Sequence, residues 1–244
     1  MTKTADNLTV AYTYDSNGNI VTTTDESGTT TRAYDALNRV ISKTVSGIGQ
    51  TRYLYDVTSG VPANCYGETV TDPKGNVRTE IYDRSGRLYQ VKTGNDTTTY
   101  AYYANGNRQS MTYPNGVTAE YTYYGNNRLH TLANKRGTTL LSTFNYAYDG
   151  NGNIVTKLEL EGTTSYIYDD LNRLDTVTEP GGKVTEYAYD EAGNRVAQTV
   201  TEDNEVTTTS YAYNGQNRLT DTVEDSGDIE NTVNYQYDNN GNTV

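Results

Sequence analysis

Residues 166–174 of the chain read YIYDDLNRL, and this stretch contains the pattern that predicts the fold. Tyr166 and Tyr168 are two positions apart, so on a strand both side chains lie on the same face. Asn172 follows Tyr168 by four residues, and Asn adopts a left-handed backbone conformation at low cost. An aromatic strand end followed by such a residue is typical of a β-hairpin loop. The Asp169 side chain can accept backbone N–H bonds within that loop.

The same pattern recurs about eleven times along the chain. The tyrosines that precede the predicted loops are Tyr14, Tyr34, Tyr55, Tyr82, Tyr102, Tyr123, Tyr148, Tyr168, Tyr189, Tyr213 and Tyr237. Asp follows eight of these eleven tyrosines, and most intervals are 20 to 25 residues long. The residues that define the clearest repeats are Tyr14, Asp15, Gly18, Tyr34, Asp35, Asn38, Tyr82, Asp83, Gly86, Tyr148, Asp149, Gly152, Tyr168, Asp169, Asn172, Tyr189, Asp190 and Gly193.

A period of 20 to 21 residues accommodates two strands and two turns. The sequence therefore predicts an all-β fold of tandem antiparallel β-hairpin repeats, whose twist would curl the sheet into a spiral or shell. No helix is expected, because apolar residues do not recur at helical spacing. Residues 1–244 are interpreted as a single array, and as a fragment of a longer chain. The longest interval, from Tyr55 to Tyr82, contains residues 61–67, which are interpreted as an inserted loop.

Composition restricts the class of protein further. The formal net charge of -12 argues against nucleic acid and anionic membranes as partners, since phosphate binding needs clustered Lys and Arg. Few aliphatic residues are present, but 25 Tyr and 42 Thr favour strands, so we expect a core rich in tyrosine. The sequence shows neither an apolar run long enough to span a membrane nor a signal peptide in this segment.

Catalytic chemistry is not indicated by the sequence. His130 and Cys65 are about 65 positions apart and are interpreted as structural or incidental, so neither a catalytic residue, a metal site nor a cofactor is predicted. The paired tyrosines could form a scaffold by packing between strands or a platform for sugar rings. The arginines that follow the loops are expected to pair with aspartates of neighbouring units. These arginines are Arg39, Arg87, Arg128, Arg173 and Arg218.

The alternating motifs Tyr-Asp-x-x-Gly-Asn and Tyr-Asp-x-x-Asn-Arg-Leu closely resemble the YD repeat of the RHS family. Clear copies occupy residues 14–20, 168–174 and 189–195, and the resemblance covers essentially the whole chain. It implies a β-sheet that spirals into a hollow shell, which in toxin members encloses a C-terminal toxin. It also implies export or cell-surface display, and carbohydrate binding for some members. The Asp72-Pro73-Lys74-Gly75 segment partly resembles the family's self-cleavage segment but lies within a repeat, so we interpret it as a turn.

Two functions remain open at this point. The first is a non-enzymatic structural segment of an exported RHS/YD-repeat protein, as part of a β-shell that in the parent protein encapsulates a C-terminal toxin. The alternative is an extracellular adhesion or carbohydrate-binding module. The expected partners are the remainder of the longer chain, glycans, and further copies that associate edge to edge through unpaired strands. Neither nucleic acid binding nor membrane insertion is expected, and the expected location is extracellular or at the cell surface.

Overall fold

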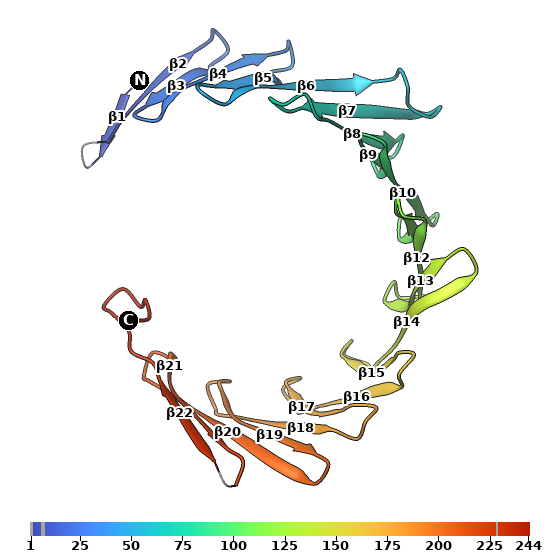
Figure 1. Ribbon diagram of the computed structural model, residues 1–244, viewed down its shortest axis with the longest axis vertical. Coiled ribbons are helices and arrows are strands. Elements are labelled where there is room, and N and C mark those ends of the chain that lie inside the picture. Colours follow the sequence, from blue (N-terminus) through green and yellow to red (C-terminus); the bar gives the residue numbers. More distant parts are fainter. Residues whose placement is uncertain (1, 6–7, 228) are drawn as a thin grey trace. The chain divides into compact units, whose positions relative to one another are not determined.

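A computed structural model describes residues 2–5, 8–227 and 229–244 (Figure 1). The chain divides into two compact units, Met1–Ala119 and Glu120–Val244, and each is described by itself. The division falls within β12 (Val117–Tyr123). In both units the described secondary structure consists of β-strands joined by short loops. The predicted all-β class is confirmed.

The first unit is a succession of antiparallel strands in which each strand pairs with the next one along the chain. Its strands are β1 (Thr2–Ala5), β2 (Leu8–Tyr14), β3 (Ile20–Asp25), β4 (Gly28–Tyr34), β5 (Val40–Val45), β6 (Gly49–Val57), β7 (Cys65–Thr71), β8 (Val77–Asp83), β9 (Leu88–Thr93), β10 (Asp96–Tyr102) and β11 (Arg108–Thr112).

The second unit follows the same plan, again with consecutive antiparallel pairs. Its strands are β13 (Leu129–Arg136), β14 (Thr139–Tyr148), β15 (Ile154–Leu158), β16 (Thr163–Tyr168), β17 (Leu174–Thr178), β18 (Val184–Tyr189), β19 (Arg195–Glu202), β20 (Glu205–Tyr213), β21 (Leu219–Asp225) and β22 (Glu230–Asn234). The prediction of tandem antiparallel hairpins is therefore confirmed in each unit.

A β-bulge adjoins most loops of the repeat. On β16 and β17, Tyr168 pairs with Leu174 whereas the preceding Ile167 pairs with Thr176, so the outgoing strand carries one extra residue. The same shift occurs just before Tyr14, Tyr34, Tyr82, Tyr102, Tyr148, Tyr189 and Tyr213. A bulge bends a strand and redirects the neighbouring side chain. Here it lies beside the tyrosine that ends each strand.

The units contain little conventional core. Among the described residues, the buried apolar side chains are Ile81, Ala119 and Ala133, and the buried polar ones are Thr164 and Thr185. Most tyrosines are half-buried instead of forming the expected tyrosine-rich core. The physical reason is that the described strands of each unit make their extensive contacts with their chain neighbours, so the described residues form no second layer over either face. Stability must therefore come from links between adjacent hairpins.

The insertion in the third repeat lies three residues earlier in the chain than predicted. Residues 58–64 form an irregular loop, but Cys65 and Gly67 already belong to β7 and pair with Asp83 and Ile81. The expected loop over 61–67 was therefore wrong at its C-terminal end, because these residues complete the ladder to β8.

Candidate functional site

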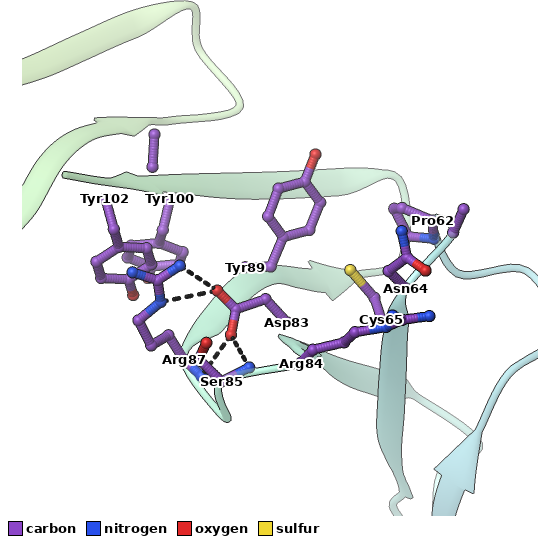
Figure 2. Close-up of a pocket in the computed structure, with 12 residues that line it drawn as sticks. Pro62, Asn64, Cys65, Asp83, Arg84, Ser85, Arg87, Tyr89, Tyr100 and Tyr102 are labelled. Carbon is purple, nitrogen blue, oxygen red and sulfur yellow. Dashed lines mark hydrogen bonds and ion pairs between the residues drawn. The ribbon is translucent and has the colours of Figure 1, made fainter. Parts of the chain in front are cut away.

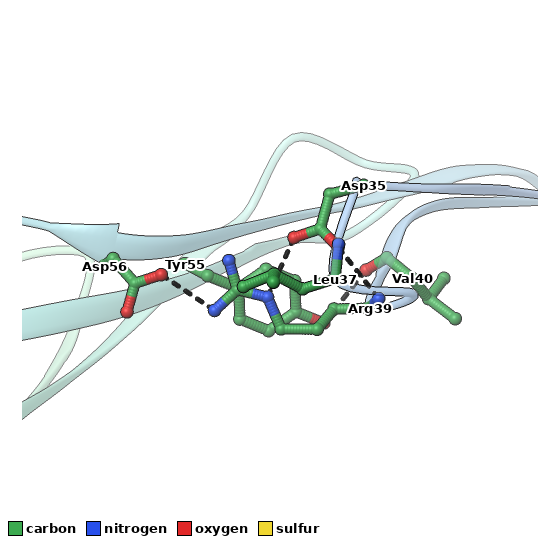
Figure 3. Close-up of polar contacts among 6 residues, drawn as sticks. All are labelled: Asp35, Leu37, Arg39, Val40, Tyr55 and Asp56. Atoms are coloured by element: carbon green, nitrogen blue, oxygen red, sulfur yellow. Dashed lines mark hydrogen bonds and ion pairs between the residues drawn. The ribbon is translucent and has the colours of Figure 1, made fainter.

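The loop after β4 shows how the aspartate of the repeat works (Figure 3). Asp35 Oδ1 accepts hydrogen bonds from the backbone N–H groups of Leu37 and Arg39, both at 2.9 Å. Its Oδ2 accepts a hydrogen bond from Arg39 Nε at 2.8 Å. The Asp35 N–H donates to the Arg39 carbonyl, and Asn38 has a φ of 61°. One carboxylate thus ties together both ends of a five-residue loop.

The same carboxylate arrangement recurs in both units. It stabilises the ionised form, because each hydrogen bond is donated to the charged group. The backbone N–H groups of Arg39 and Arg173 lower the pKa of Asp35 and Asp169, although partial desolvation opposes this effect. The pKa is also lowered by such loop hydrogen bonds at Asp15, Asp72, Asp83, Asp149, Asp190 and Asp238.

A left-handed residue occupies the fourth loop position in each of these loops. The φ values range from 61° at Asn38 to 101° at Gly152 among the predicted repeat-defining residues. The others of this set are Gly18, Gly86, Asn172 and Gly193. The Asp72 segment adopts the same loop, with the Asp72 N–H donating to the Asn76 carbonyl, so it is a turn in the structure.

Loops that end in Gly-Asn connect to the next loop through an amide. Asn19 donates a hydrogen bond to Asp15 in its own loop at 2.9 Å and to Asn38 Oδ1 in the following loop at 2.8 Å. The corresponding pairs are Asn153 with Asn172 and Asn194 with Asn217, at 2.9 and 3.1 Å. Each acceptor is the left-handed residue of an Asn-Arg loop. Alternation of the two loop types is therefore required for this contact.

Loops that end in Arg contact the next hairpin through a cation–π interaction with a tyrosine ring. Arg39 lies with its guanidinium 4.4 Å from the centre of the Tyr55 ring, and Arg173 lies 4.6 Å from that of Tyr189. Equivalent contacts join Arg87 to Tyr102, Arg128 to Tyr148 and Arg218 to Tyr237, at 4.9, 5.6 and 4.8 Å. Cation–π contacts of this kind stabilise by about 0.5–1 kcal/mol at exposed sites.

The expected pairing of these arginines with aspartates of neighbouring units was largely wrong. Arg87 and Arg173 pair with the aspartate four residues earlier in their own loops, as does Arg39. Arg39 alone of the three also pairs with a neighbouring aspartate, Asp56, at 2.7 Å. The loop is tight enough to bring the arginine back to its own carboxylate, which leaves the guanidinium face for the next tyrosine.

The tyrosine hydroxyls provide the third link. Tyr168 donates to the Ile154 carbonyl at 3.0 Å, and Ile154 is the first residue after the preceding loop. Seven further hydroxyls make the same contact at 2.8 to 2.9 Å, from Tyr34, Tyr55, Tyr102, Tyr148, Tyr189, Tyr213 and Tyr237. These hydroxyls are occupied in the structure, which favours the scaffold interpretation over a sugar platform. Glycan binding stays a prediction.

The loop after β20 of the second unit lacks its carboxylate. Asn214 replaces the aspartate, and its Oδ1 accepts the Arg218 N–H at 3.1 Å. Arg218 Nε is buried and has no hydrogen-bond partner among the described residues. In the Asp169 loop the corresponding Nε donates to a carboxylate oxygen at 2.7 Å. The difference follows because the second side-chain atom of Asn is a donor.

Two grooves mark departures from the repeat. In the first unit a groove of about 530 Å³ lies between the 58–64 insertion, the Asp83 loop and the tyrosines of β9 and β10 (Figure 2). In the second unit a groove of about 610 Å³ lies where Tyr124 replaces the loop aspartate. His130 packs on Tyr124 with ring centres 4.5 Å apart, whereas Cys65 lines the first groove. The two residues therefore have separate surroundings.

Sequence reasoning missed the links between hairpins. The tyrosines and arginines were recognised, but the hydroxyl-to-carbonyl bonds and ring contacts were not. The signal was the alternation of Gly-Asn and Asn-Arg loops in the regular repeats, which implies that each loop type contacts the other. Among the described residues, His, Cys, Asp and Glu do not gather into a group able to hold a metal ion. In that part of the chain, helices able to cross a membrane are also absent.

The fold and its repeated loops define a tandem β-hairpin repeat protein. The family described as RHS Repeat matches residues 14–47, 148–184 and 168–206. Segments of both units therefore match the RHS repeat family. No protein of curated function matches the chain in sequence.

Three solved structures share the fold. The TcdB2-TccC3 structure is similar with a TM-score of 0.61 and 16% identity, over 97% of this chain and 17% of that one. The TcdB2-TccC3-Cdc42 structure gives a TM-score of 0.52 and 15% identity, over 97% and 19%. The Tc holotoxin pore of Photorhabdus luminescens gives 0.50 and 15%, over 96% and 19%. The chain thus spans less than a fifth of the length of these chains.

Proposed function

We propose that this chain is a non-enzymatic structural segment of an exported RHS-repeat protein, and that its strands form part of a β-shell around a C-terminal toxin. The remainder of the longer chain is then its main partner, and the extracellular space or the cell surface its location. The likeness in fold to Tc toxin chains that are more than five times longer supports this proposal.

The observation that carries the proposal is the set of links between hairpins. Tyrosine hydroxyls, arginine faces and loop asparagines are all used to tie one hairpin to the next. A sheet built in this way holds together without a second layer packed on it. One face is then available for an enclosed polypeptide, whereas an enzyme would need converging groups in a cleft.

Limited proteolysis of the full-length gene product tests this function. We expect the polypeptide C-terminal to the repeats to resist protease at neutral pH, and to be digested once the repeats are unfolded by urea. The same C-terminal region expressed without the repeats is the matched control and should be digested at once. Equal digestion of that region in the intact and the isolated forms would contradict the proposal.

A further inference from the structure

The groove of the first unit differs from the repeated surface in its lining. Its walls come from Pro62 and Cys65 near the insertion, from the Asp83 loop, and from Tyr89 and Tyr100. Figure 2 shows the Cys65 sulfur pointing toward Tyr89, with the Arg84 side chain extending toward Cys65. A volume of about 530 Å³ lies within the range of small-molecule sites.

Tyr89 is not part of the links between hairpins. It occupies the second position after its loop, where other repeats have Val21, Val155 and Val196. Its hydroxyl has no hydrogen-bond partner in the described part of the chain, unlike those of the loop tyrosines. The ring and hydroxyl of Tyr89 are therefore both free to contact a ligand, and an aromatic ring is a favourable partner for another ring.

The charge of the groove is opposite to that of the protein. Asp83 is satisfied within its loop, since its Oδ2 accepts hydrogen bonds from Arg87 at 2.7 and 2.8 Å. Arg84 is exposed and forms no ion pair with any described residue. Two arginines and one aspartate leave the lining with one net positive charge, in a chain whose formal net charge is -12. A guanidinium that lacks an ion-pair partner binds a carboxylate well, through two parallel hydrogen bonds.

We propose that this groove binds an aromatic carboxylate of single-ring size, with the ring against Tyr89 and the carboxylate on Arg84. The Cys65 thiol borders the ring, and sulfur contacts with aromatic rings are favourable. The site is independent of the role of the repeats in a shell, because the three side chains assigned to the ligand, Tyr89, Arg84 and Cys65, do not link the hairpins together.

Cys65 is the only cysteine of the chain, so its alkylation reports on this groove directly. The probe is 4-hydroxyphenylacetate, and its neutral amide is the matched control compound. The rate of Cys65 alkylation by iodoacetamide is measured at increasing probe concentration. A ligand of this size should bind with a Kd of about 1 mM. At about twice that concentration the acid should slow alkylation about threefold, whereas the amide should slow it much less.

Three variants test the assigned roles. Arg84→Gln should remove the difference between acid and amide, and Tyr89→Ala should abolish protection by both. Arg136→Gln, an exposed arginine on β13 outside the groove, should protect as the unchanged protein does. Circular dichroism is used to check that each variant is folded. Absence of saturable protection by the acid, or an acid preference that survives in Arg84→Gln, would overturn the proposal; Arg84 is exposed, so this variant remains informative if Tyr89→Ala does not fold.

Discussion

The hairpins from Tyr148 to Tyr189 and the segment from Tyr55 to Tyr82 share the same strand pairing but complete it differently. In the regular hairpins, the tyrosine that precedes each loop donates its hydroxyl hydrogen bond to a backbone carbonyl of the preceding hairpin. Tyr82 instead donates to the Glu80 carboxylate at 2.6 Å, and its ring stacks on Tyr66 with centres 5.5 Å apart.

In the third repeat, packing of the insertion takes the place of the hydrogen bond that Tyr82 does not make to a backbone carbonyl. A Cβ atom at Gly67 would lie only 3.2 Å from Val61 of the insertion, so the loop packs directly on β7. Ile81, the Cα partner of Gly67, is fully buried. The links between hairpins are therefore local, and one repeat can exchange them for other contacts while the sheet continues. The exchange also creates the groove around Tyr89, as is common where loops vary on a constant scaffold.

Acid should have the largest effect, because the regular hairpins depend on ionised loop aspartates. Folding lowers the pKa of Asp149, Asp169 and Asp190, so these groups bind fewer protons in the folded than in the unfolded state. Their contribution is present above a pH of about 4 and is lost as the pH falls through the lowered pKa values. Melting temperatures by circular dichroism should fall steeply below pH 4. A melting temperature that stays constant from pH 6 to pH 2.5 would contradict this interpretation.

The second prediction compares two glycines with positive φ. Gly162 lies in a regular hairpin with φ 138°, and a Cβ there would approach the Pro180 Cβ to 2.7 Å. Gly60 lies in the insertion with φ 73°, and its Cβ would meet nothing within 4 Å. Gly162→Ala should lower the free energy of unfolding by about 3 kcal/mol through strain and overpacking, and Gly60→Ala by about 1 kcal/mol. Urea denaturation measures both, and equal losses would show that the Pro180 contact is unimportant.

The third prediction separates the two kinds of tyrosine. Tyr168→Phe removes a hydrogen bond to a backbone carbonyl and should cost about 1 kcal/mol at neutral pH. Tyr82→Phe should cost less, because the Glu80 carboxylate it leaves also pairs with Arg78 and is partly solvated.

Stability at alkaline pH tests the contact between Tyr82 and Glu80 separately. The Glu80 hydrogen bond, together with partial burial, raises the pKa of Tyr82 to about 12. Its contribution to stability is complete below a pH of about 10 and is lost as the pH rises toward 12. Tyr82→Phe should therefore lose less stability between pH 10 and pH 12 than the unchanged protein does. Parallel curves for the two proteins in thermal melts over that range would argue against the Glu80 contact.

The smallest effect is expected from exchanging two loop residues. Asn214→Asp supplies an acceptor for the buried Arg218 Nε and should raise the free energy of unfolding by about 0.5 kcal/mol. Asp169→Asn creates the opposite situation at Arg173 and should lower the urea midpoint. Effects of the same sign in the two variants would show that the loop carboxylate does not act through the arginine.

The sequence was sufficient for the repeat, the strands and the loops, since each is encoded within about 20 residues. Each loop is determined by local hydrogen bonding and backbone preference. The pattern is a tyrosine followed by an aspartate, then a Gly or Asn three residues after the aspartate, and then an Asn or Arg. Such local consistency can be recognised in a single chain.

Tertiary structure alone decided how hairpins contact each other and where a groove opens. The Tyr168 hydroxyl reaches a carbonyl 14 residues earlier. No local pattern specifies that partner, since Tyr82 follows the same register shift but donates to Glu80. Arg173 was expected to pair with an aspartate of a neighbouring unit, yet the tight loop returns it to Asp169 and places its guanidinium face over Tyr189. Tyr89 stands where other repeats have valine and Arg84 occupies a variable loop position, but neither feature by itself predicts a groove. Their surroundings depend on where the 58–64 insertion packs, which is a property of the folded sheet.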